Sequence, residues 1–218
     1  MEKQTLLLEH NYRPAKNPSE NPPVIIMLHG YGSDENDLFS FASELPEKYA
    51  IISLKAPIRL EPYGNAWYNI YFDNSQGKFS DDEQAIASRE IVSKCIDEII
   101  AKYKIDSENI TLLGFSQGTI LSFALALSYP KKVKNIIGLS GYINEEILKK
   151  DYAENDFSRL KVYTSHGSVD QVIPVQWARK TEPFLKKLNI DVTYSEFPVG
   201  HGVAPQNFYE LKNWLDKQ

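Results

Sequence analysis

Short apolar segments alternate along the chain with longer segments in which apolar residues recur every three or four positions. Some short segments, such as Val24–Leu28 and Asn135–Leu139, are apolar without alternation, as expected of strands covered on both faces of a sheet. Strands that alternate with helices are typical of parallel βα units. The pattern therefore predicts an α/β fold with a mostly parallel central sheet and helices on both faces. The expected strands are Thr5–Glu9, Val24–Leu28, Ala50–Leu54, Asn109–Leu113, Asn135–Leu139, Lys161–Ser165 and Asp191–Phe197.

The longer segments predict helices. In the segment Asp82–Tyr103, apolar residues from Val92 onward form one stripe at helical spacing, so we interpret Cys95, which lies in the stripe, as a core thiol. No linker, repeat or shift in composition divides the chain, and residues 1–218 are expected to form a single domain. The expected helices are Glu35–Leu45, Asp82–Tyr103, Gln117–Ser128, Val175–Leu188 and Pro205–Lys217.

The segment from Ala56 to Ser80 has no clear periodicity. Loops of that length without secondary structure are uncommon in compact domains and usually have a function. The segment is either a packed surface loop with a local aromatic core, or a lid or pocket wall for an apolar substrate, and we expect the second. Its aromatic residues are Tyr63, Trp67, Tyr68, Tyr71, Phe72 and Phe79.

Composition and charge narrow the class of partner. The chain carries 24 Lys and Arg against 29 Asp and Glu, a net charge of −5, and so lacks the basic surface that binds nucleic acid or an anionic membrane. Its single cysteine excludes an internal disulfide and a cysteine-based zinc site. The apolar run Leu6–Leu8 is too short for a secretion signal, and no apolar stretch has the length of a membrane span. We expect a cytoplasmic protein, with no integral membrane association, that acts on a small molecule.

A G-x-S-x-G motif, Gly114 to Gly118, lies between a predicted strand and a predicted helix. This is the context of a nucleophile elbow, a turn so tight that the serine has a strained backbone and an exposed hydroxyl. Side chains at the two flanking positions would collide with neighbouring backbone, and glycine removes them. The motif predicts that Ser116 is a catalytic nucleophile.

A serine nucleophile needs a histidine base and a carboxylate, which follow the serine in the order acid, then histidine. Of the four histidines, only His201 lies after both Ser116 and a carboxylate at a strand end, in a glycine-flanked loop. Asp170 follows the strand Lys161–Ser165, whereas Asp191 opens the next strand and should lie at the opposite edge of the sheet. We therefore predict Asp170 as the acid.

Acyl transfer also needs two N–H donors for the oxyanion of the tetrahedral intermediate. We expect one from Gln117, after the nucleophile, and one from Tyr31, between two glycines of the loop after the second strand. His29 in that loop is interpreted as a residue that fixes the loop by hydrogen bonds. No motif suggests a metal or a dinucleotide, and no cofactor is expected.

These residues resemble the phospholipase/carboxylesterase family of α/β-hydrolases, which includes small bacterial carboxylesterases and acyl-protein thioesterases. The resemblance covers Val24 to about Trp214 and implies a single α/β-hydrolase domain. The motifs that carry it are Leu28-His29-Gly30-Tyr31-Gly32, Ala56-Pro57-Ile58-Arg59 with Trp67-Tyr68, Gly114-Phe115-Ser116-Gln117-Gly118, His166-Gly167-Ser168-Val169-Asp170 with Val172-Ile173-Pro174, and Gly200-His201-Gly202-Val203.

By this resemblance Ser116, Asp170 and His201 are the triad, and the backbones of Tyr31 and Gln117 form the oxyanion hole. Three positions depart from the family pattern: Thr119 replaces a glycine or other small residue, Tyr31 replaces a leucine, and Asn69 replaces a common aspartate. Residues expected to border the substrate pocket are Trp67, Tyr68, Val172 and Val203.

The function expected from the triad and the aromatic segment is a serine carboxylesterase that hydrolyses small to medium acyl esters through an acyl-enzyme. One alternative is an acyl-protein or acyl-CoA thioesterase, or a lysophospholipase, with the same triad. Another is a catalytically silent hydrolase fold that binds a ligand or partner. An acylated protein is thus a second candidate substrate.

Overall fold

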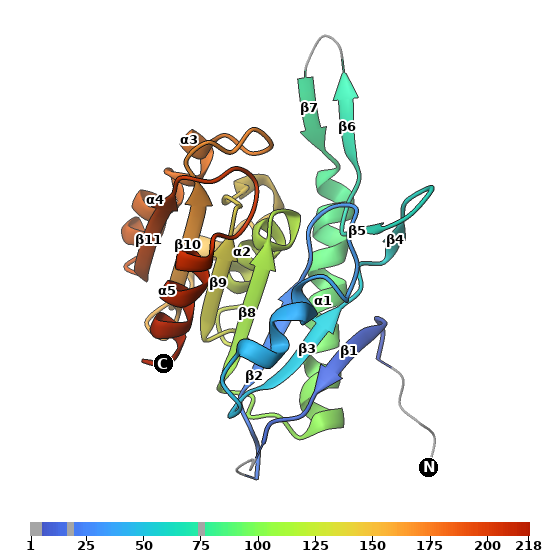
Figure 1. Cartoon of the computed structure of the whole chain (residues 1–218), viewed down its shortest axis with the longest axis vertical. Helices are drawn as coiled ribbons and strands as arrows, with labels where there is room; N and C mark the ends of the chain where they lie inside the picture. The colour runs from blue at the N-terminus through green and yellow to red at the C-terminus, as the bar shows by residue number, and fades with distance from the viewer. Residues whose placement is uncertain (1–5, 17–19, 74–76) are drawn as a thin grey trace.

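A seven-stranded sheet runs through the middle of the molecule (Figure 1). The structure is a computed structural model and describes residues 6–16, 20–73 and 77–218. In the strand order β1-β3-β2-β8-β9-β10-β11, β1 pairs antiparallel with β3 and the other pairs are parallel. This confirms the mostly parallel α/β sheet. The strands are β1 His10–Arg13, β2 Val24–Leu28, β3 Ala50–Leu54, β8 Ile110–Phe115, β9 Asn135–Leu139, β10 Lys161–Gly167 and β11 Asp191–Phe197.

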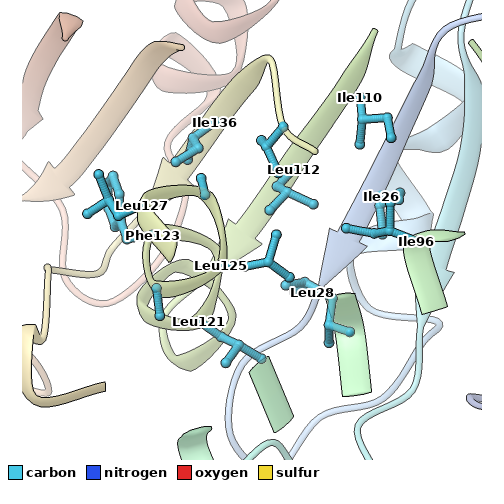
Figure 2. Packing of buried hydrophobic residues seen from close by; sticks show 14 of the residues in the cluster. Ile26, Leu28, Ile96, Ile110, Leu112, Leu121, Phe123, Leu125, Leu127 and Ile136 are labelled. Carbon is cyan, nitrogen blue, oxygen red and sulfur yellow. The ribbon is translucent and has the colours of Figure 1, made fainter. Parts of the chain in front are cut away.

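Both faces of the sheet are covered. Alternate residues of a strand point to opposite sides, and on β2 the two sets belong to different core clusters. Ile26 and Leu28 of β2 belong to the core cluster that includes α1 and α2 (Figure 2). Ile25 and Met27 belong to a second cluster with η1 and α5. A strand buried on two faces needs apolar side chains at every position, which explains the runs without alternation. The helices are η1 Leu38–Glu44, α1 Asp82–Tyr103, α2 Gln117–Ser128, η2 Glu145–Ile147, η3 Tyr152–Glu154, α3 Val175–Ala178, α4 Thr181–Lys187 and α5 Pro205–Leu215.

Helix α1 has the bounds that the sequence predicts. The side chain of Asp81 caps its first turn by accepting a hydrogen bond from the N–H of Gln84. Lys104, in the left-handed conformation, ends it. The predicted stripe faces the core, and Cys95 within it is fully buried. Burial raises the pKa of its thiol to about 12, so the interpretation of Cys95 as a core thiol agrees with its position.

The first strand differs from the prediction. Residues 6–9 of the expected strand Thr5–Glu9 pair with no strand, Thr5 lies outside the described residues, and β1 begins at His10. Leu8 is buried in the core instead. The polar segment of β1 pairs with β3 at the edge of the sheet, and Arg13 anchors it by donating hydrogen bonds to carbonyls of the neighbouring turn, including that of Tyr49 at 2.8 Å. Leu8 thus serves packing, whereas Leu7 is exposed, and the polar residues that follow pair with β3.

Two predicted helices are shorter or divided. The expected helix Glu35–Leu45 is the 3₁₀ helix η1. The expected helix Val175–Leu188 is divided into α3 and α4, because Pro183 has no N–H to donate to the carbonyl of Arg179, four residues before it, and its ring crowds that carbonyl. The last helix ends at Leu215 rather than at Lys217.

The segment 56–80 is not a single irregular loop. It contains two short antiparallel pairs, β4 with β5 and β6 with β7, and the second projects beyond the sheet in Figure 1. The strands of this segment are β4 Ile58–Arg59, β5 Asn65–Ala66, β6 Ile70–Asp73 and β7 Gly77–Ser80.

No helix in the described part of the chain is long and apolar enough to cross a membrane.

Candidate active site

Ser116 lies in the tight turn between β8 and α2, with backbone angles φ 53° and ψ −115°. Such a conformation strains a residue with a side chain and is typical of functional sites. A Cβ atom on Gly118 would lie 1.9 Å from the carbonyl oxygen of Leu28, and one on Gly114 would lie 2.6 Å from backbone atoms of Gly118. The predicted need for both glycines of the elbow is confirmed.

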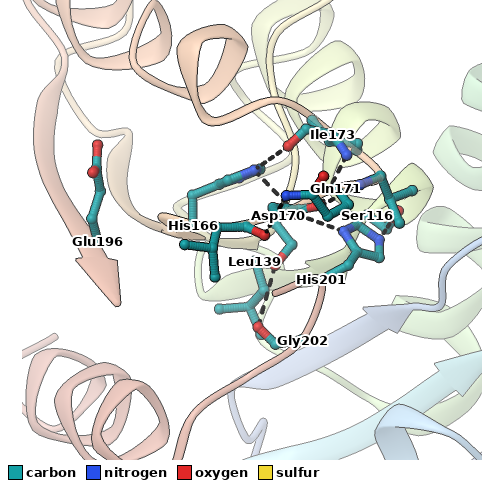
Figure 3. Close-up of polar contacts among 12 residues, drawn as sticks. Ser116, Leu139, His166, Asp170, Gln171, Ile173, Glu196, His201 and Gly202 are labelled. Atoms are coloured by element: carbon teal, nitrogen blue, oxygen red, sulfur yellow. Dashed lines mark hydrogen bonds and ion pairs between the residues drawn. The ribbon is translucent and has the colours of Figure 1, made fainter. Parts of the chain in front are cut away.

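Ser116, His201 and Asp170 form a continuous line of hydrogen bonds (Figure 3). The Nε2 atom of His201 is 2.9 Å from Ser116 Oγ, and its Nδ1 atom is 2.7 Å from Asp170 Oδ2. A carboxylate only accepts, so Nδ1 carries the proton and Nε2 is free to accept the proton of the serine hydroxyl. This arrangement activates a serine for nucleophilic attack.

The carboxylate of Asp170 is buried and held on both oxygens. Its Oδ1 accepts hydrogen bonds from the backbone N–H groups of Val172, at 2.7 Å, and Ile173, at 3.0 Å. Burial opposes its ionisation, but the hydrogen bonds from His201 and from these two N–H groups outweigh burial and lower the pKa of Asp170. Asp170 is therefore held as a charged acceptor. Asp191, the rejected candidate, opens β11 at the opposite edge of the sheet.

The loop after β2 lies beside the elbow, and His29 fixes it. The Nε2 atom of His29 accepts a hydrogen bond from the N–H of Ala56 at 3.0 Å, which leaves Nδ1–H to donate to the carbonyl of Gly30 at 2.8 Å. Burial lowers the pKa of His29 and keeps the ring neutral. These are the loop-fixing hydrogen bonds expected of His29. Among the described residues, no backbone group accepts a hydrogen bond from the N–H of Tyr31, and Gln117, as the first residue of α2, has no acceptor for its N–H within the helix, so both are free to donate to a ligand.

The side chain of Gln117 connects the elbow to the segment 56–80. Its Oε1 accepts from the N–H of Trp67 at 2.9 Å, and its Nε2 donates to the carbonyl of Tyr68 at 2.7 Å. The indole N–H of Trp67 donates in turn to the carbonyl of His29 at 2.9 Å. A G-x-S-x-G motif says nothing about the side chain after the serine, so sequence reasoning missed this contact.

Thr119, which departs from the family pattern, joins the ends of two strands below the elbow. Its Oγ1 accepts a hydrogen bond from the N–H of Leu139 at 2.9 Å and lies 2.7 Å from the carbonyl of Gly114. Its side chain fills space that two glycines leave open, since a Cβ on Gly138 or Gly141 would lie 2.9 or 2.5 Å from it. The larger residue is thus matched by small neighbours.

A cavity of about 270 Å³ opens beside Ser116 and His201. Two predicted pocket residues, Tyr68 and Val172, line it, as does Tyr31. Trp67 and Val203, both within the described residues, do not line it: Trp67 is fully buried and Val203 packs against the second core cluster. The full lining is Tyr31, Tyr68, Ile70, Ser80, Ser116, Gln117, Ile120, Tyr142, Val172, Ile173, Trp177 and His201.

Tyr142 and Trp177 form a wall of the cavity that sequence reasoning missed. Their rings meet edge to face, with centroids 5.1 Å apart. One follows β9 and the other lies on α3, so no local spacing connects them. Among the described residues, no group of three or more histidine, cysteine or carboxylate side chains could hold a metal ion.

Comparisons with known proteins give the same picture. The family model described as Phospholipase/Carboxylesterase matches residues 14–218. Acyl-protein thioesterase 1 of Kluyveromyces lactis is 32% identical over 223 residues, which cover 94% of this chain and 93% of that protein. The crystal structure of the Bacillus cereus carboxylesterase superposes with a TM-score of 0.84 at 21% identity, over 97% of this chain and 94% of that chain. For acyl-protein thioesterase 2 of Zea mays the TM-score is 0.74 at 20% identity, over 96% and 98%.

The parallel sheet, the strained serine between β8 and α2, and the similar folds define an α/β-hydrolase. The family model that matches residues 14–218 and the relative from Kluyveromyces lactis identify one family among the α/β-hydrolases. The chain belongs to the phospholipase/carboxylesterase family, as the sequence motifs indicated, and is by family a serine hydrolase of carboxylic ester bonds.

Proposed function

We propose that the chain is a serine carboxylesterase that hydrolyses small to medium acyl esters through an acyl-enzyme. Ser116 attacks the acyl carbonyl while His201 accepts its proton, and Asp170 holds the imidazole in the productive tautomer. The N–H groups of Tyr31 and Gln117 stabilise the oxyanion. His201 then protonates the departing alcohol, and activates the water that releases the acid from Ser116.

The observation that carries this proposal is the unbroken hydrogen-bonded line from Ser116 through His201 to Asp170, at 2.9 and 2.7 Å. A silent binding protein would have no need for a strained serine whose hydroxyl faces a base. All three groups follow the carboxyl ends of strands, where sites in such sheets gather. The N–H groups of Tyr31 and Gln117, which have no backbone acceptor in the described part of the chain, add the remaining element that acyl transfer requires.

The volume of the cavity supports a small to medium acyl ester as the substrate. Its volume of about 270 Å³ is near the lower limit of ligand pockets, which run from about 300 to about 1,000 Å³. Tyr68, Ile70 and Ser80 contribute to its lining from the segment 56–80. This supports the role of that segment as a pocket wall, in which we place substrate selection.

The test is hydrolysis of nitrophenyl esters from short to long acyl chains by the wild type and by Ser116→Ala. We expect Ser116-dependent hydrolysis that is fastest for short and medium chains. Losing the nucleophile should lower kcat by about three orders of magnitude or more. Equal rates for the two proteins would refute the assignment, and a monotonic increase with chain length would refute the size class.

A thioesterase that acts on acylated proteins is a second candidate, favoured by the name of the yeast relative, acyl-protein thioesterase 1. Oxyesters and thioesters are attacked by the same triad, so the geometry supports both. Parallel kcat/KM values for an oxyester and a thioester with the same acyl chain separate them. A preference of about 100-fold or more for the thioester would favour the thioesterase. Such a ratio corresponds to about 3 kcal/mol in activation free energy.

Labelling by a fluorophosphonate probe tests the silent-fold alternative directly. We expect one equivalent on the wild type and none on Ser116→Ala. Folded wild type that stays unlabelled would point to a binding protein.

Three expectations stay predictions. They are the single-domain organisation of residues 1–218, the cytoplasmic location and a lid motion of the segment 56–80.

A further inference from the structure

A second histidine, His166, lies against the carboxylate of Asp170 on the side away from His201 (Figure 3). It belongs to β10, its side chain is fully buried, and its Nε2 atom is 3.3 Å from Asp170 Oδ2. The same Nε2 is 2.9 Å from the carbonyl oxygen of Ile173. The proposed mechanism gives this ring no role.

The surroundings of His166 determine its tautomer. Its Nε2 faces two acceptors, the carbonyl of Ile173 and the carboxylate of Asp170, so Nε2 carries a proton. Its Nδ1 is buried and has no hydrogen-bond partner among the described residues. A proton on Nδ1 would be a buried donor without an acceptor, which costs about 1–3 kcal/mol. The neutral ring therefore carries its proton on Nε2.

This N–H reaches the acid in two ways. It holds the carbonyl of Ile173, and the N–H of the same residue donates to Asp170 Oδ1 at 3.0 Å. It also places the positive end of an N–H dipole near Oδ2, the oxygen that accepts from His201. One side chain thus orients the turn that carries the acid and weakens the negative potential that the acid exerts on the base.

We propose that His166 is a positioning residue for the triad: its neutral, Nε2-protonated imidazole fixes the carboxylate of Asp170 and limits how strongly that carboxylate holds the protonated form of His201. The inference rests on the proposed function. Its expected kinetic consequence is that loss of the His166 N–H changes both kcat and the acid limb of the pH profile of kcat/KM.

The other charged groups near His166 are already paired. Glu196 is its register partner on β11, and this carboxylate accepts hydrogen bonds from Arg179 at 2.7 and 2.8 Å and from Tyr194 at 2.8 Å. Strand β9 and helix α3, which also pack on β10, contain no titratable residue. Helix α5 packs on β10 as well and carries Tyr209, Glu210 and Lys212, and the carboxylate of Glu210 accepts a hydrogen bond from Ser195. Asp170 is thus the carboxylate through which a change at His166 reaches His201.

The experiment compares the pH profiles of kcat/KM for the wild type, His166→Leu and His166→Gln. Leucine fills the space without a donor, whereas the amide nitrogen of glutamine reaches the place of Nε2. For His166→Leu we expect kcat to fall by about 10- to 100-fold, as for a misplaced catalytic group. The midpoint of the acid limb should rise by about half a pH unit, because the protonated base is held more strongly. His166→Gln should restore the midpoint and most of the rate.

His10→Leu serves as the matched control. His10 is on the edge strand β1 and bonds the hydroxyl of Tyr103, so its loss should leave the midpoint in place. An unchanged midpoint in His166→Leu, or a glutamine variant that behaves like the leucine variant, overturns the inference while Ser116-dependent hydrolysis continues. Hydrolysis that does not depend on Ser116 overturns the proposed function as well.

A measurement on the wild type needs no variant to fold. The ¹⁵N chemical shifts of the histidine rings distinguish the two neutral tautomers from the imidazolium. We expect one buried ring to be neutral and protonated on Nε2 at neutral pH, and its signal to vanish in His166→Gln. An imidazolium or an Nδ1-protonated ring at position 166 would overturn the inference.

Discussion

The backbone N–H of Trp67 donates a hydrogen bond to the side-chain oxygen of Gln117 at 2.9 Å, across fifty positions of the chain. The side-chain nitrogen of Gln117 donates a hydrogen bond to the carbonyl of Tyr68 at 2.7 Å. The residue whose backbone is expected to stabilise the oxyanion therefore also holds a wall of the cavity through its side chain. The two roles are separable, because one belongs to the backbone and the other to the amide.

Replacing Gln117 by glutamate should separate these roles. The carboxylate keeps an acceptor for Trp67 but has no donor for the carbonyl of Tyr68, so we expect a loss of about 1–3 kcal/mol in the free energy of unfolding. The backbone N–H of residue 117 stays, and hydrolysis should remain well above that of Ser116→Ala. Urea unfolding and kcat/KM for one nitrophenyl ester measure the two effects. Unchanged stability would contradict the role of the amide.

Thr119→Val should destabilise the protein more than Thr119→Ser. Valine keeps the shape but removes the hydroxyl that accepts from the N–H of Leu139 and lies against the carbonyls of Gly114 and Leu139, a net loss of about 0.5–1.5 kcal/mol for each hydrogen bond. Serine keeps the hydroxyl and loses only the methyl group that packs against Gly138 and Gly141. Thermal and urea unfolding of the pair decide the question, and equal losses would mean that packing rather than hydrogen bonding matters.

Trp177→Ala should shift the substrate profile toward longer acyl chains. Tyr142 and Trp177 line both the cavity at Ser116 and a neighbouring cavity of about 350 Å³. Removing the indole joins the two spaces, so we expect the optimum chain length to increase. Trp177→Phe is the control, since a ring stays in the wall. The ratio of kcat/KM for long and short nitrophenyl esters is the measurement, and a ratio that does not change would place the acyl group elsewhere.

Asp170 should contribute to stability in a pH-dependent way. Its pKa is lowered in the folded protein, so the contribution is fully present above the unfolded-state pKa of about 3.9 and is lost as the pH falls through the lower folded-state value. The difference in the free energy of unfolding between the wild type and Asp170→Asn should therefore shrink from about pH 6 to about pH 3. Carboxylates common to both proteins cancel in this difference. A difference that stays constant would show that ionisation of Asp170 is not linked to folding.

The triad was predictable because its determinants are local. A glycine-flanked serine between a strand and a helix, and loops that follow strands, can be recognised without knowing how the strands are ordered. The buried strands were predictable for the same reason, since burial on two faces requires continuous apolar runs such as Val24–Leu28.

The cavity was only partly predictable because its wall is tertiary. Trp67 and Tyr68 are neighbours in sequence and both are buried, yet only Tyr68 lines the cavity. The T-shaped contact of Tyr142 and Trp177 joins elements that only the fold brings together. The first strand was misplaced because hydrophobicity was taken as the signal, whereas the edge strand from His10 to Arg13 is polar.

Because Cys95 is buried, the reactivity of its thiol reports local opening of the core around α1. The lone thiol is fully enclosed between α1 and the sheet, and its pKa is about 12. A disulfide reagent at neutral pH can react with it only when the packing around α1 separates. The rate of thiol modification therefore measures how often this part of the core opens, with no introduced label and no disturbance of the serine chemistry.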